Sequence, residues 1–276
     1  MTANRSGWLQ QLPTVTKNIL ILNLGIWVFD VFSKHFGADL RGWLGLVSWS
    51  ASAFGGTYSF HIWQLVTYMF MHANFMHIFC NMFAVLMFGP ILEQQWGSKK
   101  FLTYYMVSGI GAALVQQVVW MLTMPGQMAV TIGASGAVFG LLFAFGWLFP
   151  EQKIFFLFIP IPIPARVFVG IYAAIELIAG IEGSVGDNVA HFAHLGGMLF
   201  GWLLLLYWLK APKLREKAKE KADTPFMHYH YQSPVEEDKP AEPTKRSDDV
   251  ERLLDKIKHE GYSSLTQEEK DRLFKH

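Results

Sequence analysis

The chain is built around the stretch Thr131-Ile-Gly-Ala-Ser-Gly-Ala-Val-Phe-Gly140. It opens an apolar segment that continues to Phe149, so Ser135 lies near glycines at the mouth of a predicted membrane helix. Glycine removes side-chain bulk and lets another backbone or a substrate approach closely. The free N–H groups of a helix's first turn can stabilise a negative charge. The stretch therefore indicates either a nucleophilic serine or a helix-packing site, because small residues also line membrane helix interfaces.

The composition indicates a polytopic α-helical membrane protein. Of the 276 residues, 52% are hydrophobic and only 16% are charged, against about 25% charged residues in soluble domains. The apolar residues form runs of about 20, which is enough to cross the bilayer as a helix. The net charge of +1 gives no indication of a nucleic-acid partner. The one cysteine, Cys80, excludes an internal disulfide and is interpreted as a small buried apolar residue.

Six apolar segments are predicted to cross the membrane. They cover residues 18–36, 64–89, 101–122, 135–149, 165–181 and 189–209. Between the first two, residues 37–63 mix glycine, serine and aromatic side chains, which predicts a loop lying in the membrane interface. Pro160, Pro162 and Pro164 break the chain before the fifth span.

The distribution of lysine and arginine predicts that both termini are cytoplasmic. In this orientation the outer segments carry only Lys34 and Arg41, whereas the inner segments carry the remaining basic residues. The orientation places Ser135 in the outer half of its helix. With no organelle-targeting segment visible, we expect a prokaryotic plasma membrane.

The predicted domains are a cytoplasmic N-terminus (1–17), a membrane domain (18–210), a basic flank with a flexible linker (211–247) and a cytoplasmic helical hairpin (248–276). The linker is rich in proline and charged residues. In the hairpin, Gly261 can end the first helix, and a capping box begins the second. Nothing in the hairpin indicates catalysis.

Ionisable and polar residues in the predicted spans need a reason to be there, because they are costly in a bilayer. His77 and Asn81 are four residues apart and share one helix face, with His72 nearby. His191 and His194 begin the sixth span. The predicted topology brings all four histidines to the outer side, near Ser135. Glu176, Gln116 and Gln117 are interpreted as interhelical hydrogen bonders or as lining of a water-filled cavity.

Two small-residue faces suggest how the candidate residues meet. Gly197 and Gly201 form one such face next to His194, and Gly136 and Gly140 form another next to Ser135. If these faces pack, His194 comes within hydrogen-bond range of Ser135 as a general base for a nucleophile. His77, Asn81 and the Ser135 backbone N–H would then face a developing oxyanion.

Taken together, these residues resemble the rhomboid family of intramembrane serine proteases. The resemblance covers residues 20–209 and includes the segment from Glu93 to Phe101. It rests on His77-x-x-x-Asn81, Gly133-x-Ser135-Gly136 and Ala193-His194-x-x-Gly197-x-x-x-Gly201.

The resemblance implies an all-α, six-helix rhomboid-like bundle with a Ser135–His194 dyad and no aspartate. It also implies an oxyanion hole that includes His77 and Asn81. It matches Gly133 to the glycine two residues before the serine. The family cleaves transmembrane segments of membrane proteins near the outer face, in a water-filled cavity closed by a mobile fifth helix and a cap loop. Membrane-protein substrates and the lipid bilayer are thus the implied partners, and no cofactor is required.

The resemblance further implies that the Phe139 ring packs under the catalytic histidine. Two features depart from the family pattern. Gln64 follows Trp63 where the family often has an arginine that anchors the preceding loop, which leaves the anchoring of that loop open. His191 adds a second histidine on much the same face as His194. We favour His194 as the base because it has the glycine spacing.

Two alternatives belong to other functional classes. A non-catalytic rhomboid-like protein would bind client helices, but such relatives lack the serine or the histidine. A metal transporter would use the imidazoles of His72, His77, His191 and His194 as ligands. The sequence has no HExxH motif and no carboxylate directly adjoining these histidines, so we predict a serine endopeptidase without a metal site.

Overall fold

The computed structural model describes residues 12–50, 58–156, 159–182 and 190–210, together with Lys256, His259 and Thr266. The chain divides into two compact units, Met1–Thr224 and Pro225–His276. Apart from those three residues, the predicted hairpin at 248–276 lies outside the described part of the chain, as does the linker.

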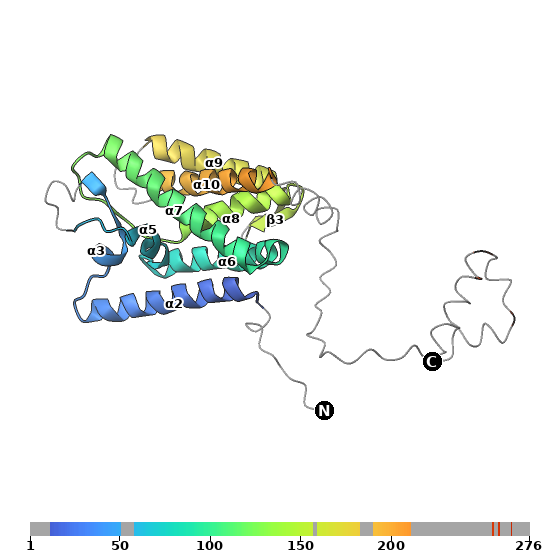
Figure 1. Cartoon of the computed structure of the whole chain (residues 1–276), viewed down its shortest axis with the longest axis horizontal. Coiled ribbons are helices and arrows are strands. Elements are labelled where there is room, and N and C mark those ends of the chain that lie inside the picture. Colours follow the sequence, from blue (N-terminus) through green and yellow to red (C-terminus); the bar gives the residue numbers. More distant parts are fainter. Residues whose placement is uncertain are drawn as a thin grey trace, which may run out of the picture. The chain divides into compact units, whose positions relative to one another are not determined.

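The first unit is mostly helical (Figure 1). Among the described residues, four helices are long and apolar enough to cross a membrane: α2 (Thr14–His35), α6 (Phe75–Trp96), α7 (Ser98–Thr123) and α10 (His191–Leu209). Two further helices, α8 (Ser135–Leu148) and α9 (Ala165–Glu182), correspond to the other two predicted spans. Shorter elements are α3 (Arg41–Leu44), α5 (Gln64–Thr67) and the 3₁₀ helix η1 (Tyr68–Phe70). The chain is therefore a multi-pass integral membrane protein.

Two short antiparallel strand pairs depart from the all-α prediction. Strand β1 (Leu46–Val47) pairs with β2 (Val130–Thr131), with Leu46 opposite Thr131. Strand β3 (Lys153–Phe156) pairs with β4 (Ile159–Pro164), the proline-rich segment expected only to break the chain. Proline has no N–H to donate, so it is tolerated on a strand that needs few ladder bonds of its own.

The second predicted span, 64–89, is wrong at both ends. Its first part is α5 and η1, and the chain then runs extended before α6 begins. Asn74 caps α6, because its side-chain oxygen accepts the His77 N–H at 2.9 Å. The helix continues through Pro90 to its end at residue 96. His72 consequently precedes α6 and does not lie on it.

Helix α8 lies at the centre and packs against α6, α7, α9 and α10 (Figure 1). It is apolar on all sides and mostly buried, as expected of a central helix. Its 14 residues span roughly 21 Å, less than the bilayer core of about 30 Å. An end of such a helix lies at membrane depth, where backbone groups are tolerated only inside protein or beside water. Ser135 is the first residue of this helix.

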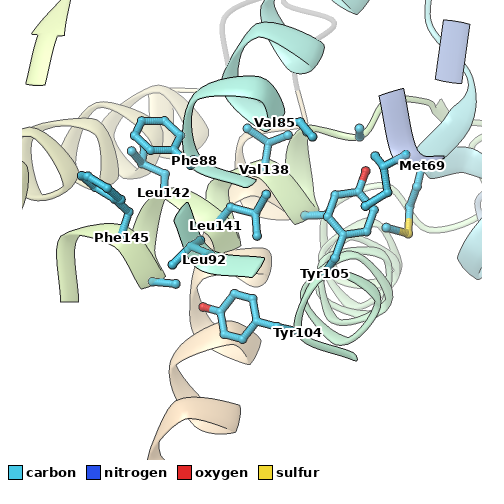
Figure 2. Packing of buried hydrophobic residues seen from close by; sticks show 14 of the residues in the cluster. Met69, Val85, Phe88, Leu92, Tyr104, Tyr105, Val138, Leu141, Leu142 and Phe145 are labelled. Carbon is cyan, nitrogen blue, oxygen red and sulfur yellow. The ribbon is translucent and has the colours of Figure 1, made fainter. Parts of the chain in front are cut away.

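The core between α6, α7 and α8 consists of large interlocking side chains (Figure 2). Phe88 and Phe145 pack with ring centroids 5.0 Å apart. The buried Tyr104 hydroxyl donates to the Gly140 carbonyl oxygen at 3.0 Å. Because lipid tails are as apolar as these side chains, close packing and buried hydrogen bonds hold the helices together.

Glycines allow α8 and α10 to touch. A Cβ on Gly197 would collide with the carbonyl oxygen of Gly136. A Cβ on Gly140 would lie 3.2 Å from the Gly197 oxygen and still closer to the Ser108 side chain of α7. These three glycines meet as the two-face hypothesis predicted. Gly201 does not take part, because a Cβ there would meet the Tyr104 side chain of α7 instead.

A buried glutamate fastens the start of α2 to the end of α6. The Glu93 carboxylate accepts the backbone N–H groups of Val15 at 2.9 Å and Thr16 at 2.7 Å. It also accepts the hydroxyls of Thr16 at 2.8 Å and Ser98 at 2.6 Å. The two N–H groups belong to the first turn of α2, where an anion is favoured.

Gln64 anchors the loop before α5. It takes this role at the position where the family often has an arginine. It is fully buried, and its Oε1 accepts the N–H groups of Val47 and His61, both at 3.2 Å. Its Nε2 donates to the Gly42 carbonyl at 3.1 Å. Gln117 of α7 adds a second amide, whose Nε2 donates to the Val47 carbonyl at 2.6 Å. Two neutral amides therefore hold this loop.

Candidate active site

Ser135 and His194 are in direct contact. The Nε2 atom of His194 lies 2.7 Å from Ser135 Oγ. Ser135 begins α8 and His194 lies in the first turn of α10, so the Gly136–Gly197 contact brings their helices together. A hydroxyl that donates to an unprotonated imidazole nitrogen is the arrangement of an activated nucleophile.

An aromatic ring supports the imidazole of His194 from one face. Phe139, one turn below Ser135 on α8, stacks on His194 with centroids 4.3 Å apart and planes 6° from parallel. The stack fixes the plane of the imidazole. Its electron-rich face also stabilises positive charge that develops on the ring.

The other nitrogen of His194 faces a carboxylate on α9. For Ser135 to donate to Nε2, neutral His194 must carry its proton on Nδ1. This Nδ1 lies 2.9 Å from Glu176 Oε2, within ion-pair range, although the two are not aligned as a regular hydrogen bond. The same Oε2 lies 2.7 Å from His191 Nδ1. His191 thus contacts Glu176, while His194 contacts both Glu176 and the serine.

His77 reaches over the loop that precedes Ser135. A Cβ built on Gly133 would lie 2.6 Å from His77 Nε2 and 3.6 Å from Ser135 Oγ. Gly133 has a φ of +132°, which L side chains rarely adopt, and its N–H donates to the Tyr68 carbonyl at 2.9 Å. The glycine therefore permits both the loop conformation and the approach of the imidazole.

The backbone selects the tautomer of His77. The Ala73 N–H donates to His77 Nδ1 at 3.4 Å, so the proton of neutral His77 is on Nε2. This Nε2 is the atom that faces the Gly133 loop. His77 accordingly presents an N–H donor beside the nucleophile.

Asn81 lies one turn further along α6 and is buried. Its Nδ2 donates one hydrogen to the His77 carbonyl at 2.8 Å, which leaves a second hydrogen on the same nitrogen. His72, by contrast, is fully buried and meets the His77 ring edge-on at 5.0 Å.

A cavity of about 1070 Å³ opens onto these groups. Ser135, His77, Asn81 and His194 line it, and most of its remaining wall is apolar. The apolar wall includes Phe79, Phe83, Met87, Val138, Phe168 and Tyr172 of α6, α8 and α9. Cys80 also lines the cavity and is exposed, so the interpretation of this cysteine as buried was wrong. An apolar cavity with polar groups gathered in one region suits a ligand that is itself largely apolar.

One acidic and two imidazole groups in the described part of the chain lie close enough to share a metal ion. Ligand atoms of Glu176, His191 and His194 all fall within 4.8 Å of one another. This set differs from the four histidines considered in the transporter hypothesis, because it includes a carboxylate. The interpretation of Glu176 as an interhelical hydrogen bonder is confirmed by its contact with His191 of α10, but sequence reasoning did not predict that the carboxylate also reaches His194. The available signal was an acidic residue in the middle of an apolar span, which needs a partner.

Comparison with known proteins adds family relationships. Residues 59–211 match the rhomboid domain family, and residues 236–276 match a family of unknown function (DUF6576). Rhomboid-like protein 11, chloroplastic, of Arabidopsis thaliana is 33% identical over 198 residues, which are 69% of this chain and 63% of the relative.

Two further relatives come from yeast and a bacterium. Rhomboid protein 1, mitochondrial, of Saccharomyces cerevisiae is 33% identical over 153 residues, or 55% of this chain and 44% of that protein. Putative rhomboid protease YdcA of Bacillus subtilis is 28% identical over 208 residues, or 74% of this chain and 92% of that protein. The chain spans less than two thirds of the length of the plant and yeast relatives.

Proposed function

Because the chain belongs to the rhomboid family, we propose that it is an intramembrane serine endopeptidase that cleaves transmembrane segments of other membrane proteins. The observation that carries this proposal is the 2.7 Å contact between Ser135 Oγ and His194 Nε2. The contact borders an apolar cavity among membrane helices. A protein that only binds client helices has no need of a serine paired with a base.

In this proposal Ser135 Oγ attacks the carbonyl carbon of a peptide bond while its proton passes to His194 Nε2. The new Oγ–C bond gives a tetrahedral intermediate. His194 then gives the proton to the leaving nitrogen as the C–N bond breaks, which leaves an acyl ester on Ser135. A water molecule, deprotonated by His194, hydrolyses this ester in a second cycle.

The donors around Ser135 would stabilise the oxyanion of each intermediate. The Ser135 backbone N–H belongs to the first turn of α8 and has no helical carbonyl partner. His77 Nε2–H and the second Nδ2 hydrogen of Asn81 supply side-chain donors. Removing one such donor from a serine hydrolase lowers the rate about 10²- to 10³-fold.

We further propose that six helices cross the bilayer, namely the four long helices together with α8 and α9. Both termini would be cytoplasmic, in a prokaryotic plasma membrane, with the serine towards the outer side. The domain division at residues 17, 210 and 247 is part of this proposal. The basic residues of the inner segments support the orientation.

Labelling with a fluorophosphonate, which reacts with activated serines, tests the proposal on purified full-length protein in detergent. We expect wild type to be labelled and to cleave a fluorescent transmembrane peptide, and Ser135→Ala and His194→Ala to lose both properties. Ser108→Ala removes a different buried serine, on α7, and should keep both. A folded wild type that is neither labelled nor active would favour the client-binding alternative.

A further inference from the structure

We propose that Glu176 is a positioning residue for His194, so that the reacting groups form a serine–histidine–glutamate array held in place by His191. This inference rests on the proposed function and adds to it, because the family pattern implies a dyad without a carboxylate.

The geometry brings two histidines of α10 to one carboxylate oxygen of α9. Glu176 of α9 places Oε2 2.9 Å from His194 Nδ1 and 2.7 Å from His191 Nδ1. All three side chains are 15% exposed or less. Since His194 Nε2 faces Ser135 Oγ, the imidazole of His194 lies between the nucleophile and the carboxylate.

The carboxylate can act on His194 in two ways. First, it favours the tautomer with the proton on Nδ1, which leaves Nε2 free to accept the serine proton. Second, it offsets the positive charge that His194 acquires when it takes this proton. In soluble serine proteases the buried aspartate of the triad fulfils both roles without itself becoming protonated.

The cost of burying Glu176 argues that the carboxylate has a task. Its neighbours Ile175 and Leu177 are 53% and 47% exposed on the outer surface of α9, whereas Glu176 is 8% exposed. A carboxylate in a membrane helix is costly unless it is paired. Here both of its partners are imidazoles, and one of them contacts the proposed nucleophile.

A purely structural role would be to fasten α9 to α10. In that case Glu176→Gln and His191→Gln should lower the unfolding temperature similarly and leave the turnover number alone. A positioning role predicts a different pattern, because Glu176 lies 2.9 Å from His194 Nδ1, whereas His191 contacts Glu176. Glu176→Gln should then lower kcat much more than His191→Gln does, with KM nearly constant.

The experiment measures kcat, KM, fluorophosphonate labelling rate and thermal unfolding for wild type, Glu176→Gln, Glu176→Asp and His191→Gln in detergent. We expect Glu176→Gln to lower kcat and the labelling rate at least about 100-fold, with KM within about threefold of wild type; in a soluble triad the equivalent change costs about 10⁴-fold. Glu176→Asp keeps the negative charge but moves it away from His194 by one methylene. Its kcat should therefore lie between those of wild type and Glu176→Gln. Glu93→Gln is the matched control, a buried carboxylate outside the site, and should lower the unfolding temperature with kcat unchanged.

A folded Glu176→Gln with kcat within twofold of wild type would overturn the inference, while an inactive Ser135→Ala in the same assay would leave the proposed function standing. If Glu176→Gln does not fold, Glu176→Asp decides by the same criterion. If wild type itself shows neither labelling nor cleavage, the proposed function fails, and this inference fails with it.

Discussion

Glu93 and Glu176 are both buried carboxylates on membrane helices, yet their partners differ in kind. Glu93 is surrounded by donors that cannot change their protonation, namely two backbone N–H groups and two hydroxyls. Glu176 meets two imidazoles, and one of them, His194, accepts the serine proton in the proposed reaction. Glu93 lies where α2 joins α6, and Glu176 lies beside the proposed nucleophile.

The difference shows that the partners of a buried charge, rather than the charge itself, decide its role. Fixed donors satisfy a carboxylate permanently, so the group holds two helices together and cannot respond to a reaction. When a partner can take up a proton, its attraction to the carboxylate becomes stronger as the proton arrives. Such an arrangement stabilises a transition state more than the ground state, which is what accelerates a reaction.

The largest effect on stability should follow from Glu93→Ala. The change removes the acceptor of the buried Thr16 N–H and hydroxyl, of the half-buried Val15 N–H and of the exposed Ser98 hydroxyl. Because unpaired buried donors cost about 1–3 kcal/mol each, not fully additively, we expect about 3–5 kcal/mol of destabilisation. The measurement is SDS or thermal unfolding in detergent, with the exposed Glu182→Ala as a control near zero. Wild-type stability in Glu93→Ala would show that these contacts are not what joins α2 to α6.

A smaller effect on stability but a clear effect on activity should follow from Gly133→Ala. The new methyl group would collide with His77 Nε2. The alanine backbone would also have to adopt a φ of +132°, which L residues disfavour. Displacing one oxyanion donor should lower kcat about 100-fold, with a loss of roughly 1–3 kcal/mol of stability from backbone strain. Steady-state cleavage of the transmembrane peptide, alongside thermal unfolding, checks both numbers. A variant that keeps wild-type kcat would mean that His77 does not need its close approach to residue 133.

Local sequence patterns predicted most of the helices and the residues around Ser135. His194 lies one turn before Gly197, and this spacing was enough to predict that His194, rather than His191, contacts the serine. Glycines that let two helices approach closely also bring the residues one turn away near the facing helix. The start of α6 was missed although Asn74 is a typical N-cap residue, since the apolar run across residues 64–89 obscured it. The catalytic roles of these residues stay predictions.

Apart from the contact between α8 and α10, the long-range contacts could not be predicted. The pairing of Val47 with Val130 depends on the meeting of two segments that are far apart in the chain. The contacts of Glu176 depend on the rotation of α9 against α10. Spacing along one helix reports which residues share a face, but not which neighbouring helix that face meets. The same reason explains the partner of Gly201, which is Tyr104 on α7.

The smallest effect should come from a third carboxylate, Asp39, at the mouth of the cavity. Its side chain is 37% exposed and pairs with Arg41 at 2.9 Å. The hydrogen bond and charge of Arg41 hold the pKa of Asp39 below its ordinary value of 3.8. A carboxylate whose folded pKa is lowered stabilises the fold above its unfolded pKa, and this contribution is lost as the pH falls through the folded pKa.

Asp39→Asn should therefore cost less than about 1 kcal/mol at pH 6, the range of exposed ion pairs. The difference from wild type should shrink below about pH 4, where the wild-type carboxyl also becomes neutral. Thermal unfolding of both proteins at pH 6 and pH 3 measures this difference, while effects of the other carboxylates cancel. A larger cost, or one that persists at pH 3, would place Asp39 with Glu93 as a structural anchor. A small cost that vanishes in acid would show that Asp39, unlike the buried Glu93, does not anchor the fold.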